Sequence, residues 1–284
     1  MLNALTIDLE DWYHPELVRG HLPVEHQDGK IKESTGPLLD LLQDRGVKAT
    51  FFVVGEVAQR HPDLVQAIAR AGHELACHGQ SHRPLWDMTP DELRGELSAF
   101  SRTMEAILPG LRIHGFRAPT FSLDNRSRWA LDILADLDYR YDSSIFPLRT
   151  PLYGVSGCPL GPYRPSPDNV AHASVEGRLV EFPMSVCTCG RLRVPVCGGF
   201  YLRALPFRLL RHCLRQINTR RPFVIYVHPW ETDPETTRLA LPLMARFVTY
   251  HNIGAVRRRL EMLLDEFAFA PMQVVLETIG ELRK

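Results

Sequence analysis

The sequence lacks an excess of charge of either sign, because its 33 lysines and arginines are balanced by 33 aspartates and glutamates. A neutral chain gives no electrostatic reason to expect nucleic acid or an anionic membrane as a partner. The sequence also lacks any run of the roughly 18 apolar residues that a membrane-spanning helix needs. Its first residues carry neither the basic start nor the long apolar stretch of a secretion signal, which predicts a cytoplasmic protein.

The six cysteines include no CxxC pair, the spacing that is typical of many structural zinc sites. In a cytoplasmic chain, free thiols are expected rather than disulfides. The sequence contains no internal repeat and no low-complexity tract. Its 284 residues, 45% of them hydrophobic, are enough to build the core of one large α/β domain.

Apolar runs alternate with amphipathic stretches along most of the chain, a pattern that predicts repeated strand–helix units. Buried strands are predicted at residues 2–7, 49–54, 73–77, 113–116, 139–142, 180–184 and 223–227, and helices at 37–44, 62–70, 90–108, 128–137, 206–217 and 242–264. Residues 146–170 are rich in proline and form a long irregular excursion, which is expected to be functional or an insertion. We predict a main α/β domain at 1–235 and a helical extension at 236–284 packed on it.

Polar, reactive side chains appear at the carboxyl ends of the predicted strands. These residues are Asp8, His78, Arg117, Asp142 and His228. In barrels and open sheets of parallel strands, this edge is where active sites are built. Five such strand ends therefore predict a catalytic site at one end of the sheet.

The segment HGQSH places His78 and His82 four residues apart, directly after a predicted strand. On a helical turn, two imidazoles at this spacing lie on one side, with about 5–6 Å between their Cβ atoms, and can bind one divalent ion. Gly79 lets the backbone turn tightly after the strand. Two unrelated polar loop histidines would give the same short pattern, so the residues alone leave both interpretations open.

The first predicted strand ends in three acids, Asp8, Glu10 and Asp11. Strand alternation puts Asp8 and Glu10 on one face, with Asp11 at the turn. One carboxylate can complete a site of two histidines and one carboxylate, and a second can act as base to a metal-bound water. The ligand is either Glu10, which the shared face favours slightly, or Asp11. Acids that simply cap the next element are the alternative interpretation.

Three further residues carry candidate roles. Arg117 can pair with a carboxylate and hold it ionised. His228 ends a run of five apolar residues, so it is either a hydrogen-bonded core histidine or a general acid. Asp142 is a candidate to orient His228 through a hydrogen bond, or a cap at the end of its strand.

Taken in chain order, five segments resemble the motifs of the polysaccharide deacetylases of carbohydrate esterase family four. The segments are TIDLED, HGQSH, RAPTF, DLDYRYDSS and IYVHPWE. The resemblance implies a deformed (β/α) barrel of mostly parallel strands with outer helices, with the deacetylase domain at 1–235. The segments DLEDWYH and CGGFYLR and the tail HNIGAVRRRLEMLLDEFAF are similar to exosortase-associated exopolysaccharide deacetylases, which carry an extra C-terminal region.

The family resemblance implies a metal-dependent hydrolase that removes N-acetyl groups from amino sugars of an exopolysaccharide or its precursor. His78 and His82 would hold a divalent ion, usually zinc, together with an acid of the first motif. Asp8 would act as base with Arg117 paired to it, while His228 would protonate the leaving amine and Asp142 would steady His228. Association with a membrane-bound exopolysaccharide synthesis complex is a further expectation.

The chain departs from the common family pattern in two places. Leu9 and Glu10 separate Asp8 from Asp11, where most members have two adjacent aspartates, and Phe121 replaces a frequent tyrosine. The candidate substrate-binding residues are Trp86, Pro119, Phe121 and Trp230. Two alternatives remain: a metal-free allantoinase-like amidohydrolase of the same fold, and a non-catalytic carbohydrate-binding protein.

Overall fold

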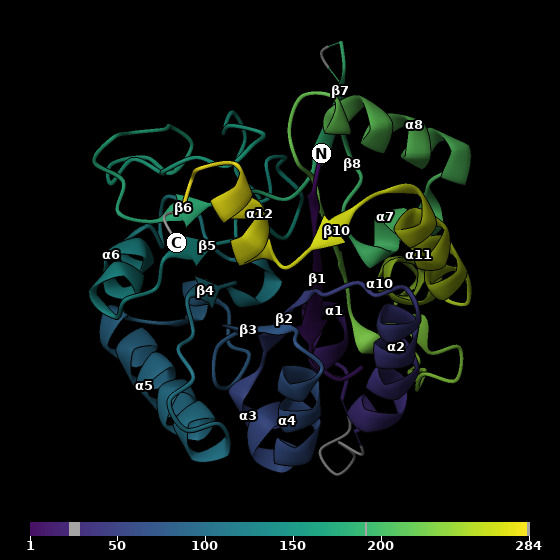
Figure 1. Cartoon of the computed structure of the whole chain (residues 1–284), viewed down its shortest axis with the longest axis horizontal. Helices are drawn as coiled ribbons and strands as arrows, with labels where there is room; N and C mark the ends of the chain where they lie inside the picture. Colours follow the sequence, from purple (N-terminus) through teal and green to yellow (C-terminus); the bar gives the residue numbers. More distant parts are fainter. Residues whose placement is uncertain (23–28, 191, 283–284) are drawn as a thin grey trace.

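The computed structural model describes residues 1–22, 29–190 and 192–282, and a parallel sheet forms its centre (Figure 1). Its strands are β1 (Asn3–Leu9), β2 (Thr50–Val53), β3 (Glu74–Cys77), β4 (Gly115–Phe116), β5 (Tyr141–Asp142), β6 (Val180–Glu181), β9 (Val224–Val227) and β10 (Phe269–Ala270). They follow the order β1-β2-β3-β4-β5-β6, while β9 and β10 both pair with β1. All these pairings are parallel, so the carboxyl ends of the main strands face one end of the curled sheet.

Strand β1 is central, since it pairs with three other strands. All seven of its residues are buried, as expected for a parallel strand that is covered on both faces. Its register sets Asp8 opposite Phe52 of β2 and Ile7 opposite Val227 of β9. The acids that follow β1 therefore emerge beside the ends of both neighbouring strands.

Helices surround the sheet in Figure 1, as expected for repeated strand–helix units. They are α1 (Glu16–Arg19), α2 (Ile31–Asp44), α3 (Gly55–Arg60), α4 (Pro62–Arg70), α5 (Pro90–Ile107), α6 (Trp129–Asp136), α7 (Gly199–Ala204), α8 (Phe207–Asn218), α9 (Pro229–Thr232), α10 (Leu243–Tyr250), α11 (Ala255–Glu266) and α12 (Met272–Thr278), with short 3-10 turns η1 (Leu85–Asp87) and η2 (Pro119–Phe121). Helix α5 begins with a capping box, in which Glu92 N–H donates to Thr89 Oγ1 at 3.3 Å and Thr89 N–H donates to the Glu92 carboxylate at 2.8 Å. Within the described ranges, no helix has the length and apolar character needed to cross a bilayer.

The C-terminal region enters the sheet as well as covering it. Strand β10 pairs with β1 at Asn3 and Ala4, and α12 places Met272, Val275 and Leu276 in the core cluster that contains Ala4. The predicted extension at 236–284 is therefore not purely helical. A two-residue strand is too short to produce a periodic sequence pattern, which explains why it was not predicted.

Residues 146–170 form neither a helix nor a strand, as their proline content predicted. The excursion is fixed by backbone bridges, in which Tyr163 pairs with Glu181 of β6 and Pro165 with Ala173. A hairpin that sequence analysis did not resolve follows β6. It consists of β7 (Val186–Cys189) and β8 (Leu192–Pro195).

Candidate active site

The predicted strand-end residues converge at the carboxyl end of the sheet. Asp8 lies on β1, His78 follows β3, Arg117 follows β4 and His228 follows β9. A pocket of about 140 Å³, which we call the inner pocket, is lined by Asp8, His78, His228 and Glu10 among other residues. Four segments that are distant in sequence therefore contribute to one buried site.

His78 and His82 both line this pocket, and their rings meet edge to face with centroids 5.0 Å apart. The segment between them is a loop and not the predicted helical turn, because Gly79 has φ +77° and His82 has φ +56°. A histidine in the left-handed region costs of order 1–3 kcal/mol, and such strain is typical of functional sites. His78 Nδ1 lies 2.8 Å from the Arg117 carbonyl, to which it can donate, so Nε2 is left to bind a cation.

Glu10 completes this cluster. Its carboxylate lies 2.5 Å from His82 Nε2 and 2.9 Å from His228 Nε2. One ligand atom each of Glu10, His78 and His82 lie within 4.8 Å of one another, all from buried residues. Among the described residues, His82 Nδ1 is buried without a hydrogen-bond partner. This donor set fits a divalent cation held by two imidazoles and one carboxylate.

The charge states of the cluster suit cation binding. Burial opposes ionisation of Glu10, but the charges of His82 and His228 outweigh it and hold the pKa of Glu10 well below its ordinary value. Burial lowers the pKa of His78 to about 4. An ionised carboxylate and a neutral imidazole are the forms that coordinate a metal.

Asp11 has a different place. Its carboxylate accepts hydrogen bonds from the backbone N–H groups of Trp12 at 2.8 Å, Lys30 at 3.2 Å and Ile31 at 3.1 Å. The last two precede or begin α2, so Asp11 caps that helix from a distance. Of the two predicted carboxylate ligands, Glu10 reaches the histidine pair, and Asp11 is not part of the cluster.

Arg117 fixes Asp8. The guanidinium is fully buried, and its Nη1 lies 2.5 Å from Asp8 Oδ1. Its other nitrogens donate to the carbonyl and the hydroxyl of Ser143, each at 3.0 Å. The second carboxylate oxygen, Asp8 Oδ2, lies 3.9 Å from His228 Nε2. Asp8 is therefore held by one oxygen and presents the other near His228.

His228 lies between two carboxylates. Its Nε2 contacts Glu10, and its Nδ1 lies 2.8 Å from Glu231 Oε2. Glu231 is itself paired with Arg203 at 2.9 Å, and the Trp230 ring stacks on the imidazole at 5.4 Å. Burial lowers the pKa of His228, but the charges of Glu10 and Glu231 raise it more, so the net pKa lies well above the ordinary value.

Asp142 does not contact His228, contrary to the sequence prediction. It accepts a hydrogen bond from Ser144 Oγ at 2.5 Å and interacts electrostatically with the buried carboxyl group of Glu181. The role predicted for Asp142, orienting His228, is filled by Glu231. Sequence analysis missed Glu231, although its place three residues after His228 in HPWE matches the spacing of a capping box.

His14 also lies at the site and was not predicted. Its ring centroid is 5.3 Å from that of His82, and its Nδ1 accepts a hydrogen bond from Asp11 N–H at 2.8 Å. Burial lowers the pKa of His14 to about 3, so the ring is neutral near pH 7. The sequence signal was the single histidine that ends the segment DLEDWYH.

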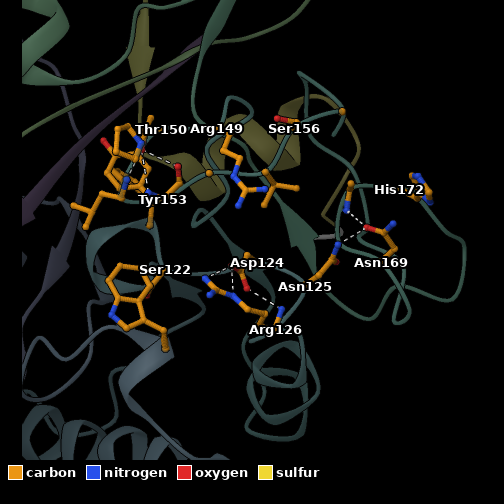
Figure 2. A pocket seen from close by; sticks show the side chains of 18 of the residues that line it. Ser122, Asp124, Asn125, Arg126, Arg149, Thr150, Tyr153, Ser156, Asn169 and His172 are labelled. Atoms are coloured by element: carbon orange, nitrogen blue, oxygen red, sulfur yellow. Dashed lines mark hydrogen bonds and ion pairs between the residues drawn. The ribbon is translucent and has the colours of Figure 1, made fainter.

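The four candidate substrate-binding residues occupy different places. Phe121 and Trp230 line the inner pocket. Phe121 also lines a second, larger cavity together with Trp86, shown in Figure 2. Pro119 is buried against Gly79 beneath the histidine loop, and it is not among the residues that line either cavity.

Comparison with known families divides the chain near residue 142. Residues 25–141 match the family model described as polysaccharide deacetylase, and residues 143–277 match a domain of unknown function (DUF3473). A peptidoglycan-N-acetylglucosamine deacetylase from Bacillus cereus is 32% identical over 115 residues, which are 40% of this chain and 42% of the relative. A chitooligosaccharide deacetylase from Bradyrhizobium is 32% identical over 108 residues, 38% of this chain and 47% of the relative. The chain thus spans less than half the length of these relatives.

Solved structures share the fold over nearly the whole chain. A Mycobacterium smegmatis protein, provisionally described as a polysaccharide deacetylase, superposes with a TM-score of 0.65 at 23% identity and covers 99% of this chain and 90% of its own. Puue allantoinase superposes with a TM-score of 0.61 at 14% identity, and the match covers 99% of this chain and 91% of the allantoinase chain. The predicted deformed barrel is therefore confirmed. Because an allantoinase shares it, the activity has to be argued from the site.

Proposed function

We propose that the chain is a metal-dependent N-deacetylase of amino sugars in a polysaccharide, starting from the match of residues 25–141 to the polysaccharide deacetylase family model. The observation that carries the proposal is the convergence of Glu10, His78 and His82 with Asp8 and His228 in one pocket. Asp8, Glu10 and His228 lie outside the residues matched by the family model, so their proximity to the histidine pair is independent support.

Glu10, His78 and His82 would hold the divalent ion, which we propose to be zinc. A cation at this position supplies Lewis acidity toward the acetyl carbonyl and lowers the pKa of a bound water. The protein supplies three donors at the mouth of a buried pocket and leaves further coordination positions for water and substrate. His78 is fixed in the required tautomer by the Arg117 carbonyl.

Asp8 is the base in this proposal. Arg117 holds Oδ1, so Oδ2 is the oxygen that can accept a proton from the attacking water. The guanidinium donates four hydrogen bonds, to Asp8 Oδ1, to Thr6 Oγ1 and to the carbonyl and hydroxyl of Ser143, which keep the orientation of this carboxylate constant during the reaction. Positioned acid–base groups of this kind contribute about 10²–10⁴ to the rate.

His228 is the acid that protonates the leaving amine. Nε2 faces the pocket while Nδ1 is held by Glu231, whose negative charge favours the protonated imidazole. Trp230 stacked on its ring offers an apolar wall to the sugar. We further propose an exopolysaccharide or its precursor as substrate; recruitment to a membrane-bound synthesis complex stays a prediction.

The direct test is metal content together with acetate release from N-acetylglucosamine oligosaccharides. The purified chain should contain about one divalent ion and should release acetate. His82→Ala should lose the ion and the activity, because one of three ligands is removed. His212→Ala is the matched control, since His212 is exposed on α8 and lines neither cavity. Full activity of His82→Ala would refute the assignment.

The same assay separates the alternatives. A metal-free amidohydrolase would hydrolyse a ureide such as allantoin with no bound ion and would be indifferent to chelation. A carbohydrate-binding protein would bind the oligosaccharide at saturating zinc without releasing acetate. Acetate release that is abolished by chelation and restored by zinc supports the deacetylase.

A further inference from the structure

A second cavity adjoins the inner pocket, and we call it the outer groove. It has a volume of about 1090 Å³, against about 140 Å³ for the inner pocket. The two share wall residues, namely Glu16, Phe121, Leu152 and Tyr153. Pockets for drug-sized ligands have about 300–1,000 Å³. The inner pocket alone is too small for a saccharide chain, whereas the outer groove has the required room.

The walls of the outer groove are held in place by hydrogen bonds. The Thr150 hydroxyl accepts the N–H groups of Leu152 at 3.2 Å and Tyr153 at 3.0 Å. On the opposite side, Asn125 Nδ2 donates to Asn169 Oδ1 at 2.9 Å. The irregular excursion is thus tied both to itself and to the segment before α6, so the groove is formed before any ligand arrives.

Aromatic rings mark the passage between the two cavities. Phe121 and Tyr153 line both cavities, with ring centroids 5.4 Å apart, and Trp86 lines the outer groove. Such rings offer rigid apolar faces, against which the C–H faces of pyranose rings can pack. A chain whose acetylated unit enters the inner pocket would run along these rings into the outer groove.

The charged side chains that line the outer groove differ in their ion pairs. Arg126 pairs with Asp124 at 2.7 Å, and Glu16 lies 3.8 Å from Arg19. For Arg149, no carboxylate of the described residues lies within ion-pair distance. Figure 2 shows its side chain directed into the groove between the excursion and the Asn125 segment. A guanidinium in this position is suited to bind a carboxylate or a phosphate.

We infer that the outer groove binds the sugar units next to the acetylated one, and that Arg149 selects a polysaccharide with an anionic group there. This inference rests on the proposed deacetylase function and narrows its substrate to acidic polysaccharides. A uronic acid carboxylate and a phosphate ester both provide the required charge. The irregular excursion forms a large part of this groove.

The test compares Arg149→Gln with the wild type on three acetylated oligosaccharides of equal length. One is neutral N-acetylglucosamine, one alternates N-acetylglucosamine with glucuronate, and one is N-acetylglucosamine bearing a 6-phosphate. Arg149→Gln should raise KM about tenfold for the anionic probe whose charged group Arg149 binds. The kcat for that probe, and both kcat and KM for the neutral probe, should stay nearly unchanged. A higher KM for the glucuronate probe would identify a carboxylate as the group that Arg149 binds, and a higher KM for the 6-phosphate probe would identify a phosphate. Arg258→Gln removes an equal charge from an exposed position on α11 and should change nothing.

Binding separates this inference from the deacetylase assignment. Calorimetric titration of the glucuronate and phosphate probes into wild type and Arg149→Gln needs no turnover. Weaker binding to Arg149→Gln, with no acetate released from any probe, would support the groove and reject the deacetylase. Equal dissociation constants for the two proteins, or equal KM values on every probe, would overturn the role of Arg149 whatever the activity.

Discussion

His228 is the residue on which the proposed chemistry depends most, because its protonation state is set by two buried carboxylates. Glu10 touches Nε2 and Glu231 touches Nδ1, and together they raise its pKa well above the ordinary value. An acid catalyst works only while it is protonated, so activity should fall as the pH rises through the pKa of His228. Each carboxylate that favours the imidazolium therefore moves this alkaline limit to higher pH.

Glu231→Gln should lower kcat about tenfold and move the alkaline limit of activity to lower pH. The amide keeps the size of the side chain but removes one of the two charges that favour the imidazolium. The measurement is a profile of kcat against pH. Asp142→Asn serves as the comparison: if Asp142 oriented His228, it would be the variant that shifts the limit, and the structure predicts that it does not.

At the scale of the element, the acids at the end of β1 have two different roles, one at the proposed metal site and one in capping a helix. Glu10 points to the histidine pair, whereas Asp11 accepts hydrogen bonds at the start of α2. Both acids follow the last residue of β1, and the hydrogen bonds of Asp11 to the start of α2 direct its carboxylate away from the histidine pair. Helix α2 begins at Ile31, six residues before the predicted start, because this remote carboxylate caps it.

Two substitutions separate these roles. Glu10→Gln should lose the metal, since a neutral amide replaces the carboxylate ligand, while the protein stays folded. Asp11→Ala should keep the metal but lower the free energy of unfolding by about 1–2 kcal/mol, the usual cost of losing a helix cap. Elemental analysis and urea unfolding of both variants check this. Metal loss in Asp11→Ala from a protein as stable as the wild type would contradict the assignment.

Much of the fold was predictable from the sequence, because the signals are local. Helix α4 has the predicted bounds, and α5 has the predicted capping box. The strand-end rule also predicted which segments meet. What local patterns cannot give is the direction of a side chain after its strand ends. Asp142 ends β5 and Glu231 lies in α9 just after β9, and only their packing shows which one faces His228.

At the scale of the whole molecule, two buried carboxyl groups lie side by side where β5 pairs with β6, at one edge of the sheet. Asp142 on β5 and Glu181 on β6 are fully buried beside each other. Burial raises the pKa of Asp142 to about 6, and burial with the nearby Asp142 charge raises that of Glu181 well above its ordinary value. The folded protein therefore binds protons that the unfolded chain releases above about pH 4.

The stabilisation from this pair should be fully present below about pH 4 and should be lost as the pH rises through 6 and beyond. Asp142→Asn removes one titrating group and gives Glu181 an amide donor. The free energy of unfolding of Asp142→Asn, relative to wild type, should therefore increase from pH 5 to pH 8. Urea unfolding at the two pH values measures it. A constant difference would show that the pair does not titrate in this range.

The pairing of β1 with β9 and β10 also governs how the chain can fold as it is made. Thr6 and its hydrogen-bond partner Ile225 are 219 positions apart in the sequence, so Thr6 is synthesised long before Ile225. Until β9 and β10 have been synthesised, the apolar strand β1 has one unpaired edge, at which it can associate with other nascent chains. Closure of the barrel is thus a late event of synthesis, and translation speed or chaperone supply should govern the yield of native protein more than the intrinsic preferences of any segment.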